Sequence, residues 1–138
     1  IMLPFNVFDQ RPIQTKILEK LDKLKIEIHS RSTFLQGLLM MDYNNLPGRF
    51  NKWIEKFKNF DKLSKKLKLK KYQICLRYVL SNPYIDKVVV GTNNFKQFKE
   101  LVSTRGVLYS NISNLNSSKE INLINPSKWP NIKKGIKE

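Results

Sequence analysis

Cysteine and histidine are almost missing from this sequence of 138 residues, which contains one of each, Cys75 and His29. A single cysteine excludes an internal disulfide and a cysteine-rich zinc site, and the pair together argues against a histidine-based metal site. Cys75 lies on an apolar stripe with Tyr72, Leu76 and Val79, which predicts a buried structural thiol. The cysteine content fits a reducing cytoplasm.

Acidic residues are also scarce: 11 Asp and Glu stand against 26 Lys and Arg, which gives a net charge of +15. Such an excess can indicate nucleic acid, an acidic membrane surface or anionic ligands. Arginines do not alternate with aromatic residues as a single-strand binding platform would require. Most basic residues are lysines on the polar faces of helical stretches, as in Lys52, Lys56, Lys62, Lys65, Lys66 and Lys68. The pattern favours a solvated basic surface with general affinity for anions, and a specific polyanion partner is the alternative.

Long apolar runs are absent as well, and none approaches the roughly 20 residues that span a bilayer. We therefore expect no membrane partner. From the distribution of the basic residues described above, we also expect no specific nucleic-acid partner. The hydrophobic content of 41% is still sufficient for a core.

Apolar periodicity predicts three strands with helices between them. The expected elements are a strand end over 1–5, a helix of about 12 residues from Pro12, a strand over 26–30, helices within 50–67 and 70–80, a strand over 87–90 and a helix over 95–104. Strand, helix and strand in succession imply parallel pairing with a right-handed crossover.

Three parallel strands do not complete a domain, because parallel sheets are normally covered on both faces and open edges remain unpaired. The sequence begins at Ile1 inside an apolar segment, so we expect residues 1–104 to be one side of a larger α/β structure. Residues 105–138 are expected to form a wrapping tail with little regular structure. About eight residues at its end are expected to be disordered.

A glycine-containing turn, Gly91-Thr92-Asn93-Asn94, follows the apolar run 88–90 and precedes an amphipathic stretch. Backbone N–H groups and the helix dipole at such a turn are suited to holding a phosphate. The same pattern is also typical of an ordinary turn followed by a helix N-cap.

Four segments follow one another along the chain: residues 4–11 (PFNVFDQR), 31–39 (RSTFLQGLL), 76–81 (LRYVLS) and 89–97 (VVGTNNFKQ). In this order they resemble successive motifs of the aldo/keto reductase family. Their order and spacing are similar to the carboxyl-terminal part of that family's (β/α)8 barrel, from the sixth strand to the end, over about residues 1–105. Residues 124–129 look like the ending of some bacterial members. The resemblance implies an α/β fold, namely a partial (β/α)8 TIM barrel with its last three parallel strands, their helices and an irregular tail.

The resemblance also implies a cytosolic NADPH-dependent reductase of aldehydes or ketones, with cofactor and substrate at the carboxyl ends of the strands. By the match, Gly91, Thr92 and Asn93 would wrap the adenosine 2′-phosphate, and Gln97 and Glu100 would face the adenine ribose end. The segment from Arg31 to Gln36 would lie against the nicotinamide and pyrophosphate. Within it, Ser32 would bond the pyrophosphate, and Phe34 and Gln36 would line its channel.

Three positions depart from the family pattern. Met2 stands where the family often has a glutamine that bonds the carboxamide, Arg31 where it often has a stacking aromatic residue, and Leu101 where it often has an asparagine. An arginine can stack but also adds charge. These departures leave open a non-catalytic half-barrel scaffold or binding module that has lost the reaction.

No residue of this chain is assigned a catalytic role, since the family's Asp, Tyr, Lys and His set lies on earlier strands. The tyrosines match no catalytic position; they are Tyr43, Tyr72, Tyr78, Tyr84 and Tyr109. His29 is expected to make a packing or turn contact. The partners implied are the missing amino-terminal half of the barrel and a small carbonyl substrate.

Overall fold

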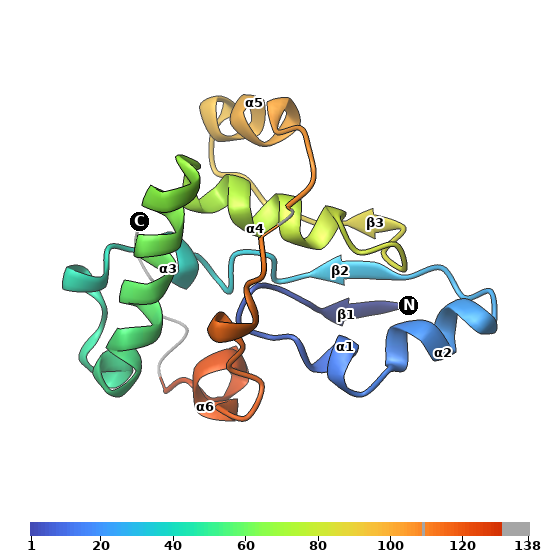
Figure 1. Ribbon diagram of the computed structural model, residues 1–138, viewed down its shortest axis with the longest axis horizontal. Coiled ribbons are helices and arrows are strands. Elements are labelled where there is room, and N and C mark those ends of the chain that lie inside the picture. The colour runs from blue at the N-terminus through green and yellow to red at the C-terminus, as the bar shows by residue number, and fades with distance from the viewer. Residues whose placement is uncertain (109, 131–138) are drawn as a thin grey trace.

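Three short parallel strands lie at the centre of the protein, in chain order. The computed structural model describes residues 1–108 and 110–130. β1 (Met2–Pro4) pairs with β2 (His29–Arg31), which pairs with β3 (Lys87–Val88). Figure 1 shows the three arrows pointing the same way, with helices around them. The parallel α/β arrangement predicted from the sequence is confirmed.

Six α-helices and five 3-10 helices accompany these strands in the described part of the chain. The α-helices are α1 (Arg11–Gln14), α2 (Ile17–Lys23), α3 (Ile54–Leu67), α4 (Lys71–Leu80), α5 (Phe95–Ser103) and α6 (Ile121–Ile124). The 3-10 helices are η1 (Leu38–Met40), η2 (Tyr43–Asn45), η3 (Gly48–Trp53), η4 (Ser113–Leu115) and η5 (Pro126–Lys128). None of the described helices combines the length and apolar character needed to cross a bilayer.

The single helix predicted from Pro12 is wrong, because the structure has two helices there. α1 is closed by Thr15, whose hydroxyl and backbone N–H both donate to the Arg11 carbonyl, at 2.8 and 2.9 Å. A side-chain hydroxyl that bonds the backbone in this way competes with continuation of the helix. Lys16 then takes a left-handed conformation, with φ of 55°, before α2 begins.

The break also changes which side chains are buried. Ile13, Ile17, Leu21 and Leu24 recur at helical spacing in the sequence, yet only Leu21 among them is buried and the other three are exposed. Leu18 and Leu21 pack with Ile28 against the sheet.

The strands are shorter than predicted or start later. The backbone N–H of Ile26 donates to the carbonyl of Leu21 at 3.1 Å, and Lys25 is left-handed with φ of 57°. The end of α2 therefore uses residues that were expected to begin the strand over 26–30. Beyond β3, the N–H of Val89 still donates to the carbonyl of Ser30 at 2.9 Å, so pairing continues past Val88.

The main core lies between η1, α3, α4 and the carboxyl-terminal tail. Phe8, in the loop after β1, is fully buried, and its ring centroid lies 5.2 Å from that of Phe57 on α3. Cys75 on α4 is buried and free, and burial raises the pKa of its thiol, so the predicted structural thiol is confirmed. The buried members are Val7, Phe8, Leu35, Leu38, Leu39, Phe50, Trp53, Phe57, Phe60, Ile74, Cys75, Ile112, Leu115, Leu123, Ile124 and Trp129.

The tail wraps across the molecule and fills part of this core. From α5 the chain crosses α4 and reaches η4 and α6 on the opposite side (Figure 1). Leu115 and Leu123 are fully buried, and Trp129 packs edge-on to Phe50 with ring centroids 5.1 Å apart. The tail therefore has more order than its scattered apolar residues predicted. The expected disorder at the end concerns residues 131–138, which lie outside the described residues.

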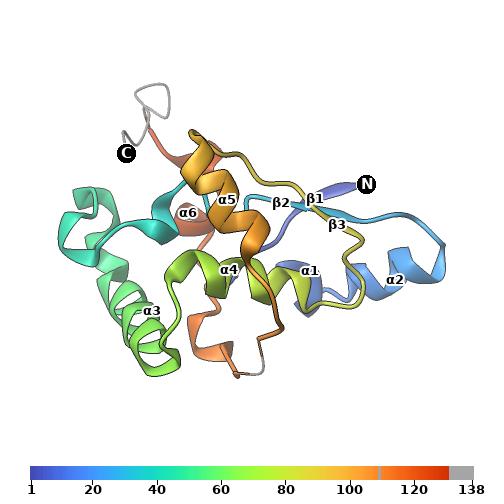
Figure 2. The same ribbon diagram turned by 90° about the horizontal axis from the view of Figure 1, so that it is seen from above.

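Helix α5 lies next to α4 at one side of the molecule, as Figure 2 shows from above. It has no buried residue. Phe95, Phe98 and Val102 are 72, 50 and 51% exposed, so its apolar face is uncovered among the described residues.

Lys68 ends α3 in a left-handed conformation with φ of 54°. We expect Lys68→Gly to stabilise the protein by about 1 kcal/mol, because glycine adopts this conformation without the steric cost that a Cβ carries. Lys62→Gly, the same exchange inside α3, is the matched control and should destabilise by about 1 kcal/mol. Urea midpoints measure both variants, and a destabilised Lys68→Gly protein would contradict the expectation.

Candidate functional site

The segments that follow β2 and β3 leave the sheet at the same end. His29 pairs with Lys87 and Ser30 with Val88, in parallel register. The hydrogen bond from Val89 to the Ser30 carbonyl extends this pairing. Residues 31–36 and 89–94 therefore start from adjacent strand ends, where a parallel α/β sheet places its ligands.

The loop after β2 contains the first group of predicted site residues. Arg31 is exposed, and its Nη1 donates to Ser32 Oγ at 3.2 Å. Phe34 is half-buried against the main core, and Gln36 is exposed. The structure thus places a guanidinium and a hydroxyl together at the carboxyl end of β2, with the Gln36 side chain exposed further along the loop.

This loop has an unusual backbone. Ser32, Leu35 and Gln36 have φ of 60°, 48° and 55°, and Gly37 has φ of 82°. Left-handed residues other than glycine carry steric strain and persist only where the surroundings hold them. Leu35 is fully buried, as are Leu38 and Leu39 just beyond it. Their packing in the main core therefore holds the loop in place.

The turn after β3 contains the second group. Gly91, Thr92 and Asn93 are all exposed. A Cβ added to Gly91 would meet nothing within 4 Å, so the space beside this residue is open. The predicted N-cap is present as well: Asn94 accepts a hydrogen bond from the backbone N–H of Gln97 at 2.9 Å.

Gln97 and Glu100 lie on the first turns of α5, as their positions predicted, but each already has a partner. The side-chain oxygen of Gln97 accepts from the backbone N–H of Asn93 at 2.9 Å, which leaves its NH₂ group for a ligand. The Glu100 carboxylate lies 3.9 Å from the ammonium of Lys70, the N-cap residue that precedes α4. Glu100 therefore also ties α5 to the start of α4.

Two buried hydroxyls beside the loop were missed by the sequence reasoning. Ser30 Oγ and Thr33 Oγ1 have no hydrogen-bond partner among the described residues, although the residues are 0 and 2% exposed. A buried hydroxyl without a partner costs free energy and requires an explanation such as water or a ligand. Ser30 on β2 and Thr33 in the following loop lie on either side of Ser32 in the sequence, and a serine or threonine at such positions carries no sequence signal that separates this role from packing.

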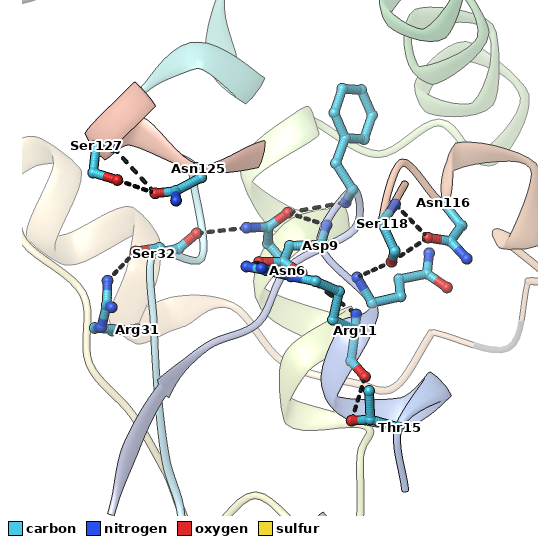
Figure 3. A network of polar contacts seen from close by, with 12 residues as sticks. Asn6, Asp9, Arg11, Thr15, Arg31, Ser32, Asn116, Ser118, Asn125 and Ser127 are labelled. Atoms are coloured by element: carbon cyan, nitrogen blue, oxygen red, sulfur yellow. Dashed lines mark hydrogen bonds and ion pairs between the residues drawn. The ribbon is translucent and has the colours of Figure 1, made fainter. Parts of the chain in front are cut away.

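Asn6 and Asp9 in the loop after β1 form a polar cluster with Arg11, the first residue of α1 (Figure 3). Arg11 Nε and Nη2 donate to the two oxygens of Asp9 at 2.8 and 2.7 Å, and Asp9 is fully buried. This bond raises the pKa of Arg11. Asn6 bonds across to the Ser32 carbonyl at 3.0 Å, so the cluster is joined to the loop after β2.

His29 lies at the other end of the strands. Its Nε2 is 2.8 Å from Glu27 Oε1, and Lys87 Nζ is 2.6 Å from the same oxygen. The hydrogen bond from Lys87, followed by that with His29, lowers the pKa of Glu27 to about 2. His29 therefore makes a local contact, as predicted, and lies away from the candidate site.

Tyr78 is half-buried, and its ring centroid lies 5.2 Å from that of Phe5. Burial, with a smaller effect from Asp9, raises the pKa of its hydroxyl, which suits packing better than proton transfer near neutral pH. Tyr109 lies outside the described residues. Within the described ranges, no group of three or more His, Cys, Asp or Glu residues could hold a metal ion.

The departures from the expected pattern do not all lie at the site. Met2 is 50% exposed and pairs with His29 at the opposite end of the strands, whereas Arg31 is in the loop after β2 and Leu101 is half-buried on α5. A separate open hollow of about 410 Å³ lies between α3 and the tail, lined by Asn59, Lys62, Leu63, Lys66, Asn111, Ser113 and Asn114. It includes none of the predicted site residues.

A model of the aldo/keto reductase family matches residues 1–115. The chain is similar to the structure of aldo-keto reductase AKR11C1 from Bacillus halodurans in its holo form, with a TM-score of 0.67 and 18% identity over 86% of this chain and 41% of that chain. For the apo form of the same protein, the TM-score is 0.64 and the identity 18%, over 86% of this chain and 43% of that chain. For the glycerol dehydrogenase AKR11B4 from Gluconobacter oxydans, the TM-score is 0.51 and the identity 18%, over 80% of this chain and 45% of that chain. None of the curated proteins matches.

These structures share the fold with this chain, which spans less than half of their length. The fold is a partial (β/α)8 barrel, as the sequence predicted.

Proposed function

Because the chain belongs to the aldo/keto reductase family, we propose that it is the carboxyl-terminal part of an NADPH-dependent reductase of aldehydes or ketones. The observation that carries this proposal is the convergence of two segments at one end of the sheet. The loop after β2 and the turn after β3 start from paired strands, so one extended dinucleotide can contact both. We place the assembled protein in the cytoplasm.

The residues present fit a dinucleotide. The two partnerless hydroxyls of Ser30 and Thr33 flank Ser32, and the space beside Gly91 is open. A phosphate at the turn would lie close to the backbone N–H groups that open α5, where the helix dipole favours negative charge. The net charge of +15 attracts such a ligand as well.

Each segment has its own part in binding. Arg31, Ser32, Phe34 and Gln36 would hold the pyrophosphate and nicotinamide end, with the guanidinium of Arg31 aimed at the Ser32 hydroxyl. Gly91, Thr92 and Asn93 would wrap the 2′-phosphate, and Gln97 and Glu100 would face the adenine ribose. When bound, the cofactor supplies the hydride that reduces the carbonyl carbon.

The proton for the carbonyl oxygen would come from outside this chain. Three-strand pairing leaves β1 and β3 with one strand neighbour each among the described residues. We propose that the amino-terminal half of the barrel joins these edges and supplies the catalytic acid. The assembled barrel, as used below, is this chain together with that half.

The test is a calorimetric titration of the assembled barrel with NADPH and, as the control, with NADH. We expect NADPH to bind at least about 10-fold tighter, because only NADPH carries the 2′-phosphate that accepts charge-assisted hydrogen bonds. If the assembled barrel binds neither NADPH nor NADH, the proposal is refuted. Equal affinities would refute the assignment of the turn to the 2′-phosphate.

A non-catalytic scaffold is the second candidate, and Met2, Arg31 and Leu101 favour it. The Met2 thioether cannot replace the two-way hydrogen bonding of a glutamine amide. Carbonyl reduction by the assembled barrel separates the two candidates, since a scaffold that has lost the reaction gives none even where it still binds NADPH.

A further inference from the structure

Asn6 joins two loops that lie far apart in the sequence. It is fully buried in the loop after β1. Its side-chain oxygen accepts from the backbone N–H groups of Phe8 and Asp9, both at 2.9 Å. Its NH₂ group donates to the carbonyl of Ser32 at 3.0 Å. Figure 3 shows this amide between the two chain segments, pointing at Ser32.

The oxygen and the NH₂ group of Asn6 do different work. The two bonds to the oxygen close a local turn, which Asn, Asp and Ser commonly do. The bond to Ser32 spans 26 residues of sequence and is not needed for that turn. It reaches the residue that begins the left-handed loop after β2.

The Ser32 carbonyl is held from two sides. Besides the Asn6 amide, it accepts from the backbone N–H of Leu35 at 3.0 Å. Together these bonds fix the peptide that follows Ser32, at a residue whose φ of 60° is strained without outside support. The orientation of the Ser32 hydroxyl, and of the Arg31 guanidinium bonded to it, depends on this peptide.

The loop that carries Asn6 is itself anchored by the tail. The N–H of Ser117 donates to the carbonyl of Phe8 at 2.9 Å, and the N–H of Gln10 donates to Ser118 Oγ at 3.2 Å. Asp9, in the same loop, forms an ion pair with Arg11. Asn6 therefore projects from a fixed base and has little freedom to follow a displaced Ser32.

We propose that Asn6 is a positioning residue that sets the Ser32 turn for the pyrophosphate of a bound dinucleotide. The inference rests on the proposed function, because the ligand is the one proposed there. Asn6 itself contacts no ligand: it acts through the Ser32 carbonyl. Its removal should weaken ligands that reach the pyrophosphate position and spare those that bind only at the turn after β3.

Two variants remove the NH₂ group while keeping the local turn. Asn6→Asp retains the accepting oxygen and, when ionised, has no donor for Ser32. Asn6→Ser retains a weaker acceptor without adding charge, and it covers the case in which a buried carboxylate prevents folding. The matched control is Asn116→Asp. Asn116 accepts from the N–H of Ser118 at 2.9 Å, belongs to the same network and does not touch Ser32.

Each variant is measured in the assembled barrel with two probes, NADPH and adenosine 2′-monophosphate, and by its thermal midpoint. We expect both Asn6 variants to raise the dissociation constant for NADPH about 10-fold, the size of one lost buried hydrogen bond. In the Asn6 variants, the dissociation constant for adenosine 2′-monophosphate should stay within about 2-fold of that of the unsubstituted barrel. In Asn116→Asp, the dissociation constants for both probes should stay within the same limit.

If Asn6 has only a structural role, its substitution should lower the affinity for both probes alike, together with the thermal midpoint. That result would overturn the inference. Unchanged NADPH affinity in both Asn6 variants would overturn it too, while leaving the proposed function intact. If the unsubstituted barrel binds neither probe, the proposed function falls and the inference falls with it.

Discussion

Gly91→Glu is expected to raise the dissociation constant for NADPH about 100-fold, because at the proposed site the new carboxylate would repel the 2′-phosphate. The substitution should leave the fold intact. A Cβ at Gly91 meets nothing within 4 Å, and the residue is exposed. The affinity for NADH, which has a hydroxyl in place of the phosphate, should change by no more than about 3-fold.

Gly91→Gln is the matched control, since it adds nearly the same volume without the charge. It should weaken NADPH by less than about 5-fold, so that the difference between the two variants measures electrostatics alone. That difference should shrink at high ionic strength, because salt screens exposed charges. Equal losses for NADPH and NADH in both variants would show a steric effect and would contradict a phosphate at this turn.

Arg11→Met should destabilise the protein by about 3 kcal/mol, because it leaves the fully buried carboxylate of Asp9 without its charged partner. Arg11 now donates to both oxygens of Asp9, at 2.8 and 2.7 Å. Methionine keeps part of the apolar stem but no donor. The expected loss lies at the low end for a broken buried pair, since the Arg11 side chain is 37% exposed and water reaches part of it. Urea unfolding measures it.

The double variant Asp9→Asn with Arg11→Met tests the cause. Without the buried charge, most of the lost stability should return, leaving a deficit of about 1 kcal/mol for the missing hydrogen bonds. If Arg11→Met alone costs less than about 1 kcal/mol, the pair behaves as a surface salt bridge and the explanation is wrong.

The elements with strong local signals were predictable from the sequence. Helix α4 ends at Leu80, just before the residues Ser81-Asn82-Pro83, whose proline does not continue a helix, and α5 begins after Asn94 as its N-cap. The break between α1 and α2 was not predictable, since the apolar spacing continued across it. Its cause is a side-chain hydrogen bond from Thr15 together with a left-handed Lys16, and neither leaves a periodic pattern.

The candidate site was predictable as positions and not as geometry. The motif order placed Ser32 and Thr92 after neighbouring strands, and the pairing of β2 with β3 agrees. The supports of Ser32 were invisible, because they come from the amide of Asn6 and from the conformation of Leu35. Long-range hydrogen bonds and left-handed residues other than glycine have no sequence signature of their own.

The bond between Ser117 and Phe8 has a consequence for folding. It joins the loop after β1 to a backbone group of the tail, far away in the sequence, and Phe8 shares the main core with tail residues such as Leu115. Contacts of such long sequence separation form slowly and late. Until the tail docks, Phe8 therefore lacks part of its cover, and a partly folded form of this chain exposes an aromatic side chain that favours aggregation.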